Sequence, residues 1–134
     1  MKYIIEKENC RMSEEHLYML FKKQDQKVSY KENMRGGQGT IMFNELLPKE
    51  LLNEKGRLFS TITIMPGCSI GYHIHENECE TFYVLEGSLI YNENNEKEYA
   101  IRKGDCVYNK NMSGHGVRNE SGKKAVILAL IIYA

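Results

Sequence analysis

The stretch that decides the fold is residues 67–87, GCSIGYHIHENECETFYVLEG, where His73, His75 and Glu80 lie in a β-prone segment bounded by glycines. Residues i and i+2 of a strand point to the same face, so His73 and His75 can project side by side while Ile74 faces away. The connection 76–79 is long enough for a tight turn. We therefore expect the next strand to return antiparallel beside the first and to point Glu80 at the two imidazoles.

A fourth ligand comes from the segment 104–119, whose single histidine is His115. Three histidines and one carboxylate form a mixed nitrogen and oxygen shell of the kind that binds a divalent transition metal. A lone histidine on a strand is more often a hydrogen-bonded core or surface residue. The combination found here arises by accident far less often, whereas His16, which lies among charged residues, is interpreted as an exposed polar residue.

The spacing of these residues resembles the cupin superfamily. Its first signature is matched at every fixed position: Gly67, His73, His75, Glu80 and Gly87. Its second signature is matched at three positions: Gly104, His115 and Asn119. Lys110 and Met112 stand where the family usually has proline and glycine, so the departure affects a turn and not a ligand.

The resemblance implies an all-β fold, a jelly-roll (cupin) β-barrel or double-stranded β-helix, with metal ligands His73, His75, Glu80 and His115. Members with this ligand set commonly use manganese or iron, and nickel, zinc and copper are also found. Iron would favour a dioxygenase, and manganese fits decarboxylation or isomerisation. An octahedral ion held by four protein groups keeps two positions for water, substrate or dioxygen.

The rest of the chain fits this fold, because short strands alternate with turn signals. The expected strands are 40–46, 58–65, 69–75, 80–86, 88–91, 98–101, 106–108, 114–118 and 125–133.

We expect residues 36–134 to form the barrel and residues 1–35 to form an extension with a short strand at 2–5 and a helix at 13–23, whose Ser13 serves as N-cap. The glycine-rich segment 33–39 lacks a following helix, so it is interpreted as an irregular lead into the first barrel strand and not as a phosphate site.

Composition narrows the class of protein. The chain has 134 residues, one domain's worth, and 18 basic residues balance 18 acidic ones, so nothing indicates a nucleic-acid or anionic-membrane partner. The apolar C-terminal run 125–134 is too short to span a bilayer as a helix. The four cysteines, Cys10, Cys68, Cys79 and Cys106, show no metal or disulfide spacing and are expected to be reduced, which favours a cytoplasmic location.

Two functional classes stay open at this stage. Period-two alternation from Glu80 turns Phe82 and Val84 inward, which predicts a largely apolar pocket with room near Gly71 and Gly87. The first class is a metalloenzyme acting on a small oxygenated metabolite, a dioxygenase or decarboxylase type. The second is a non-catalytic module that binds or senses a small molecule.

The retained ligand set tilts the choice towards the enzyme, although no acid or base can be placed in the pocket. Three strand tyrosines, Tyr83, Tyr91 and Tyr108, could donate protons, but tyrosines on strands are usually packing residues. The N-terminal residues Tyr3, Ile4 and Ile5 have no place inside a closed barrel. They suggest a homodimer that covers exposed sheet edges.

Overall fold

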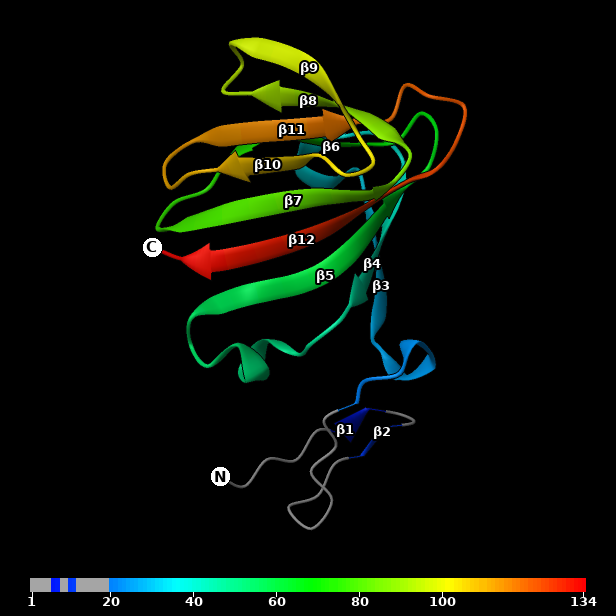
Figure 1. Cartoon of the computed structure of the whole chain (residues 1–134), viewed down its shortest axis with the longest axis vertical. Coiled ribbons are helices and arrows are strands. Elements are labelled where there is room, and N and C mark those ends of the chain that lie inside the picture. Colours follow the sequence, from blue (N-terminus) through cyan, green and yellow to red (C-terminus); the bar gives the residue numbers. More distant parts are fainter. Residues whose placement is uncertain (1–5, 8–9, 12–19) are drawn as a thin grey trace.

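The structure is a computed structural model that describes residues 6–7, 10–11 and 20–134. Two antiparallel sheets face each other in the described chain and form the expected all-β cupin barrel (Figure 1). The larger sheet has the strand order β10-β7-β12-β5-β4-β3, and its strands are β3 (Val28–Glu32), β4 (Thr40–Glu45), β5 (Gly56–Ile64), β7 (Glu78–Glu86), β10 (Cys106–Asn109) and β12 (Ala125–Tyr133). The smaller sheet has the order β6-β11-β8-β9, and its strands are β6 (Ser69–Ile74), β8 (Ser88–Glu93), β9 (Lys97–Arg102) and β11 (Gly114–Arg118).

The path of the chain after His75 corrects one expectation. β7 does not return beside β6. It pairs with β10 and β12 in the larger sheet, while β6 pairs with β11 in the smaller one. The segment after His75 therefore crosses from one sheet to the other, and Glu80 faces the histidines from the opposite wall of the barrel.

The core lies between the two sheets and follows the predicted alternation. Along β7, Glu80, Phe82 and Val84 are all buried, while Tyr83 is exposed. Alanine and isoleucine residues of β12 alternate inward in the same way, at positions 125, 127, 129 and 131. Because the side-chain period of a strand is two, this pattern fixes which face of each strand meets the site.

The N-terminal expectations fall largely outside the described residues. The strand expected at 2–5 lies there, as do Tyr3, Ile4 and Ile5, so the homodimer stays a prediction. Most of the helix expected at 13–23 lies there too, and its described end, residues 20–22, is not helical. A single 3₁₀ turn, η1 (Lys23–Asp25), follows, and β1 (Glu6–Lys7) pairs with β2 (Cys10–Arg11).

Helices are short throughout the part of the chain that the structure describes. The connection before β5 contains the 3₁₀ helix η3 (Lys49–Leu52). Among the described residues, no helix is both long enough and apolar enough to cross a membrane.

The turn that departs from the cupin signature has a strained backbone. Met112 stands where the family usually has glycine, and it adopts a φ of 69° with 61% of its surface exposed. A left-handed conformation is unfavourable for a residue with a Cβ. The Met112 amide nevertheless donates a hydrogen bond of 2.8 Å to the His75 carbonyl, so the turn still holds the two motif segments together.

The glycine-rich segment 33–39 closes the barrel next to β6. It forms the 3₁₀ turn η2 (Met34–Gly36), and its Gly37 lies against Gly71 of β6. A Cβ added at Gly71 would lie 2.0 Å from the Arg35 carbonyl oxygen, and one added at Gly37 would lie 2.3 Å from the Ser69 carbonyl oxygen. Gly71 therefore makes room for the neighbouring backbone. The sequence had suggested room for a ligand there instead.

We expect Gly71→Ala to destabilise the fold by about 1–3 kcal/mol, because two backbone segments must move apart to admit the methyl group. Urea unfolding followed by circular dichroism measures the change. Gly122→Ala is the matched control, since a Cβ there meets nothing within 4 Å, and it should stay within about 0.5 kcal/mol of the parent. Equal stability of the two variants would contradict this account of the closure.

Candidate metal centre

The structure brings the four predicted site residues together inside the barrel. One ligand atom from each of His73, His75, Glu80 and His115 lies within 4.8 Å of all the others. His73 and His115 are direct partners in the β6–β11 register, and Glu80 comes from β7 on the opposite sheet. The Nε2 atom of His75 lies 3.2 Å from that of His73 and 3.1 Å from that of His115.

Glu80 completes the cluster. Its Oε1 atom lies 3.0 Å from the Nε2 atoms of both His75 and His115. The carboxylate is 4% exposed, so water cannot solvate it freely. A buried carboxylate of this kind needs a cation or a proton nearby.

Each histidine is oriented by a hydrogen bond at its other ring nitrogen. The Nδ1 atom of His73 lies 2.8 Å from the Gly71 carbonyl, and that of His115 lies 2.9 Å from the Tyr91 hydroxyl. The Nδ1 atom of His75 meets the Glu78 carboxylate. Carbonyl and carboxylate oxygens accept hydrogen bonds, so His73 and His75 donate from Nδ1. In the neutral ring the Nε2 atom, which points into the cluster, then carries no proton. His115 takes the same form when it donates to the Tyr91 oxygen.

This arrangement fits a metal ion. When the rings carry their protons at Nδ1, three Nε2 lone pairs and a carboxylate oxygen face one another in a small buried space. A cation at the centre would satisfy all four. Mixed nitrogen and oxygen ligands suit divalent transition metals, and the described residues bring no cysteine into the cluster.

The spacing of the ligand atoms also fits a particular kind of shell. Bonds of about 2.1–2.2 Å place neighbouring ligand atoms about 3 Å apart in an octahedron and about 3.5 Å apart in a tetrahedron. The four closest separations here are 3.2, 3.1, 3.0 and 3.0 Å. They match an octahedral edge, so four protein ligands would leave positions open to a small molecule.

In the metal-free protein the protons of the cluster are shared unequally. Burial lowers the pKa of His73 to about 4, so this ring is neutral at physiological pH. Burial alone would also lower the pKa of His75, but hydrogen bonds with Glu80 and Glu78 outweigh it and raise the pKa. A proton on the Nε2 atom of His75 therefore competes with a metal ion for the same lone pair.

The two carboxylates beside His75 stay ionised. The Arg57 guanidinium holds the pKa of Glu78 at about 2, through bonds of 2.7 Å to both carboxylate oxygens. Burial alone would raise the pKa of Glu80, but hydrogen bonds from His115 and His75 lower it below its ordinary value.

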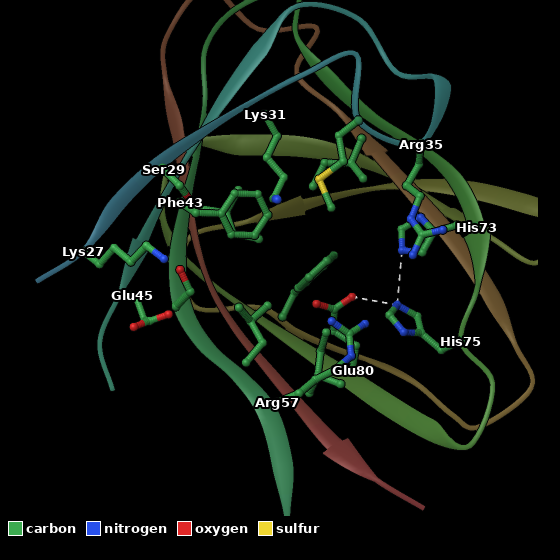
Figure 2. A pocket seen from close by; sticks show the side chains of 17 residues that line it. Lys27, Ser29, Lys31, Arg35, Phe43, Glu45, Arg57, His73, His75 and Glu80 are labelled. Carbon is green, nitrogen blue, oxygen red and sulfur yellow. Dashed lines mark hydrogen bonds and ion pairs between the residues drawn. The ribbon is translucent and has the colours of Figure 1, made fainter. Parts of the chain in front are cut away.

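A pocket of about 510 Å³ opens over the cluster. Figure 2 shows His73, His75 and Glu80 on one side, with Arg35 of η2 above His73, and Lys27, Lys31 and Glu45 on the other side. Apolar side chains line the space between, among them Phe43, Ile62 and Phe82. The expected largely apolar pocket is thus present only in part, because seven of the 17 lining residues are apolar, and Val84 belongs to the core and not to the lining.

Two supporting residues were not singled out from the sequence. Glu78 and Arg57 form a chain of contacts that ends on His75, and Arg57 comes from β5, 21 residues earlier. The sequence could have indicated Glu78, because it lies two residues before Glu80 and must share its inward face. No feature of the sequence indicated Arg57.

The tyrosines considered as proton donors divide into two groups. Tyr91 is buried and contacts His115, whereas Tyr83 and Tyr108 are exposed at 41% and 63%. Phe82 stacks on the His115 ring, with centroids 5.0 Å apart and planes 14° apart. Tyr91 and Phe82 together fix the plane of the His115 ligand.

A two-sheet barrel with three histidines and a glutamate inside one end defines a cupin. The chain belongs to the Cupin domain family (Cupin_2), whose pattern it matches over residues 60–132. An oxalate-binding protein of Thermotoga maritima is 37% identical over 100 residues, which cover 75% of this chain and 82% of that protein.

Solved structures agree with this assignment. The crystal structure of a predicted oxalate decarboxylase from Thermotoga maritima matches with a TM-score of 0.82 at 33% identity, covering 87% of this chain and 100% of that chain. The polyketide cyclase RemF from Streptomyces resistomycificus has a TM-score of 0.70 at 16% identity, over 87% of this chain and 80% of its own. At that identity the likeness shows the fold alone.

We expect alanine at His73, His75 or His115 to reduce the metal content of the purified protein severely, because each substitution removes one of the four expected ligand atoms. The same variants should lose the thermal stabilisation that added metal gives the parent, about 2.7 kcal/mol when the free ion is at 100 times its Kd. His16→Ala is the matched control. Parental metal content in all three site variants, measured by mass spectrometry of the bound elements, would show that the ligand assignment is wrong.

The Glu78–His75 contact predicts a pH signature in the metal-free protein. The pKa of Glu78 is lowered from 4.5 to about 2, so its stabilisation is complete above pH 4.5 and is lost towards pH 2. The pKa of His75 is raised from 6.5, so its stabilisation is complete below pH 6.5 and is lost as pH rises through the raised value. The stability gap between the parent and Glu78→Gln should therefore be largest between pH 4.5 and 6.5.

Urea titrations at a series of pH values measure this gap. Glu96→Gln, on an exposed hairpin, controls for the loss of a carboxylate charge. A gap for Glu78→Gln that is flat from pH 3 to pH 8 would count against the proton sharing described here.

Proposed function

We propose that this protein is a metal-dependent cupin that binds a small oxygen-rich organic acid, oxalate being the first candidate, and acts on it by decarboxylation or oxidative cleavage. The observation that carries the proposal is the convergence of four ligand atoms at one end of a pocket of about 510 Å³. The curated protein and the solved structure from Thermotoga maritima support the choice of acid, because both names refer to oxalate. Manganese and iron are the first candidates for the metal.

The roles of the chain's own residues follow from their contacts. A divalent ion, when bound, supplies a Lewis-acid contact for the oxygens of the acid. Glu78, Tyr91 and the Gly71 carbonyl hold the three imidazoles in place. The apolar lining excludes bulk water, which strengthens electrostatic contacts inside the pocket.

Binding without turnover is the second candidate, and one observation favours it. The lining residues include two carboxylates, Glu45 and Glu80. Glu80 belongs to the cluster, and Glu45 is engaged in another interaction. The described lining thus offers no uncommitted carboxylate as a general acid or base, a role that decarboxylation of a bound acid commonly uses.

One experiment distinguishes catalysis from binding without turnover. The metal-free protein is loaded separately with manganese and with iron, and oxalate is added with and without dioxygen. We expect calorimetric binding of oxalate that requires the metal, together with formation of carbon dioxide or hydrogen peroxide in the manganese or iron sample. His75→Ala, loaded under the same conditions, is the negative control.

Metal-dependent binding with unchanged oxalate recovered under every condition would select the binding module. Oxalate binding of equal strength in the metal-free protein would overturn the proposal altogether.

A further inference from the structure

The strand β3 has its side chains reversed relative to an ordinary edge strand. Its apolar residues Val28 and Tyr30 face outward and are exposed at 46% and 68%. The alternate positions line the pocket (Figure 2): Ser29 and Lys31 of the strand, and Lys27, which directly precedes it and is counted here with the β3 lysines. A shift of one residue in register would exchange the two faces, so the observed pairing of Ser29 with Phe43 places two lysines over the cavity where apolar residues would usually lie.

The Lys31 side chain is exposed, and its ammonium group lies over an aromatic ring of the pocket lining. Its Nζ atom lies 5.8 Å from the centroid of the Phe43 ring, which itself lines the pocket. Within residues 20–134, no ion pair joins Lys27 or Lys31 to a carboxylate. Both ammonium groups are therefore available to an anion that enters the pocket.

The charges of the lining favour an anion at this end. Four cations line the pocket: Lys27, Lys31, Arg35 and Arg57. Arg57 is committed to Glu78, and Arg35 lies on η2, which packs against β6 on the side of His73. Glu45 is the one carboxylate of the lining outside the metal cluster, so positive charge dominates opposite the cluster.

The size of the cavity exceeds the needs of oxalate. Pockets of about 300–1,000 Å³ hold drug-sized ligands, and this one measures about 510 Å³. Oxalate at the cluster would leave the space beside Phe43 and Ile62 without an occupant, and the lysines of β3 without a counter-charge. A longer acid would fill the space with its hydrocarbon segment and would reach the lysines.

We propose that the ligand is a small organic acid with two anionic groups separated by a short apolar segment, one group at the histidine–glutamate cluster and the other at Lys27 and Lys31. This inference rests on the proposed function, since it assigns the class of acid bound at the same metal site. A carboxylate and a phosphate-type group share the chemistry that the lysines recognise. The experiment therefore includes both.

The test uses the full chain loaded with manganese and measures affinities by calorimetry. The probes are oxalate, succinate, glutarate and adipate, the monoacids butanoate, pentanoate and hexanoate, and 3-phosphonopropionate. Each diacid is compared with the monoacid that has the same number of carbon atoms, and the phosphonate is compared with butanoate. We expect at least one longer diacid, or the phosphonate, to bind about tenfold more tightly than its monoacid, because a second charge-assisted contact forms. Lys27→Met and Lys31→Met should each reduce this preference several-fold and leave the affinity for the monoacid within about twofold of the parent.

Lys103→Met is the matched control, because this exposed lysine lies in a turn outside the pocket. Equal binding of diacids and monoacids, or a preference that survives in both β3 variants, would overturn the inference. Oxalate binding that exceeds that of every longer probe would overturn it too, while leaving the proposed function intact. Failure of the proposed function is recognised separately, as acid binding that does not require the metal.

Discussion

The site depends on one electrostatic constraint: three imidazole nitrogens and a carboxylate oxygen converge where water cannot enter freely. The hydrogen bonds at the other side of the rings leave the Nε2 atoms facing one another. Protons that the imidazoles donate to Glu80, or a bound cation, stabilise such a cluster. A proton on His75 does so partly, whereas a multivalent ion would contact every member at once. Much of the surrounding structure follows from this requirement, since the ligands come from both sheets.

The candidate ligands were predictable because they follow local spacing. His73 and His75 lie on one face by the period of the strand, and the spacing from the framing glycines matched the cupin signatures, which implied Glu80 and His115. Local spacing could not show that the chain crosses to the other sheet after His75. A tight return and a crossing connection need similar lengths, and only the pairing of β7 with β12 distinguishes them. Arg57 was hidden for the same reason, since its contact with Glu78 is a matter of tertiary packing.

The strand β3 was missed because it departs from the alternation by which strands are recognised. Lysines and a serine occupy the face that apolar residues usually take, and the segment resembles a polar linker. Departures of this kind are expected at functional sites, where a sequence satisfies a ligand instead of the core. A reversed strand is thus more informative about the ligand than the strands that follow the rule.

The contact between Gly37 and Gly71 and the side chains of β3 give the barrel two separate properties. At the glycines the barrel is closed by main chain against main chain, at positions outside the pocket lining. The charge of the lining comes in part from side chains of β3, which project from an edge strand and support little of the core. The selectivity of the pocket can therefore be altered by substitutions on a single strand while the closure of the barrel stays unchanged. That independence makes this barrel a suitable scaffold on which to redirect recognition from one acid to another.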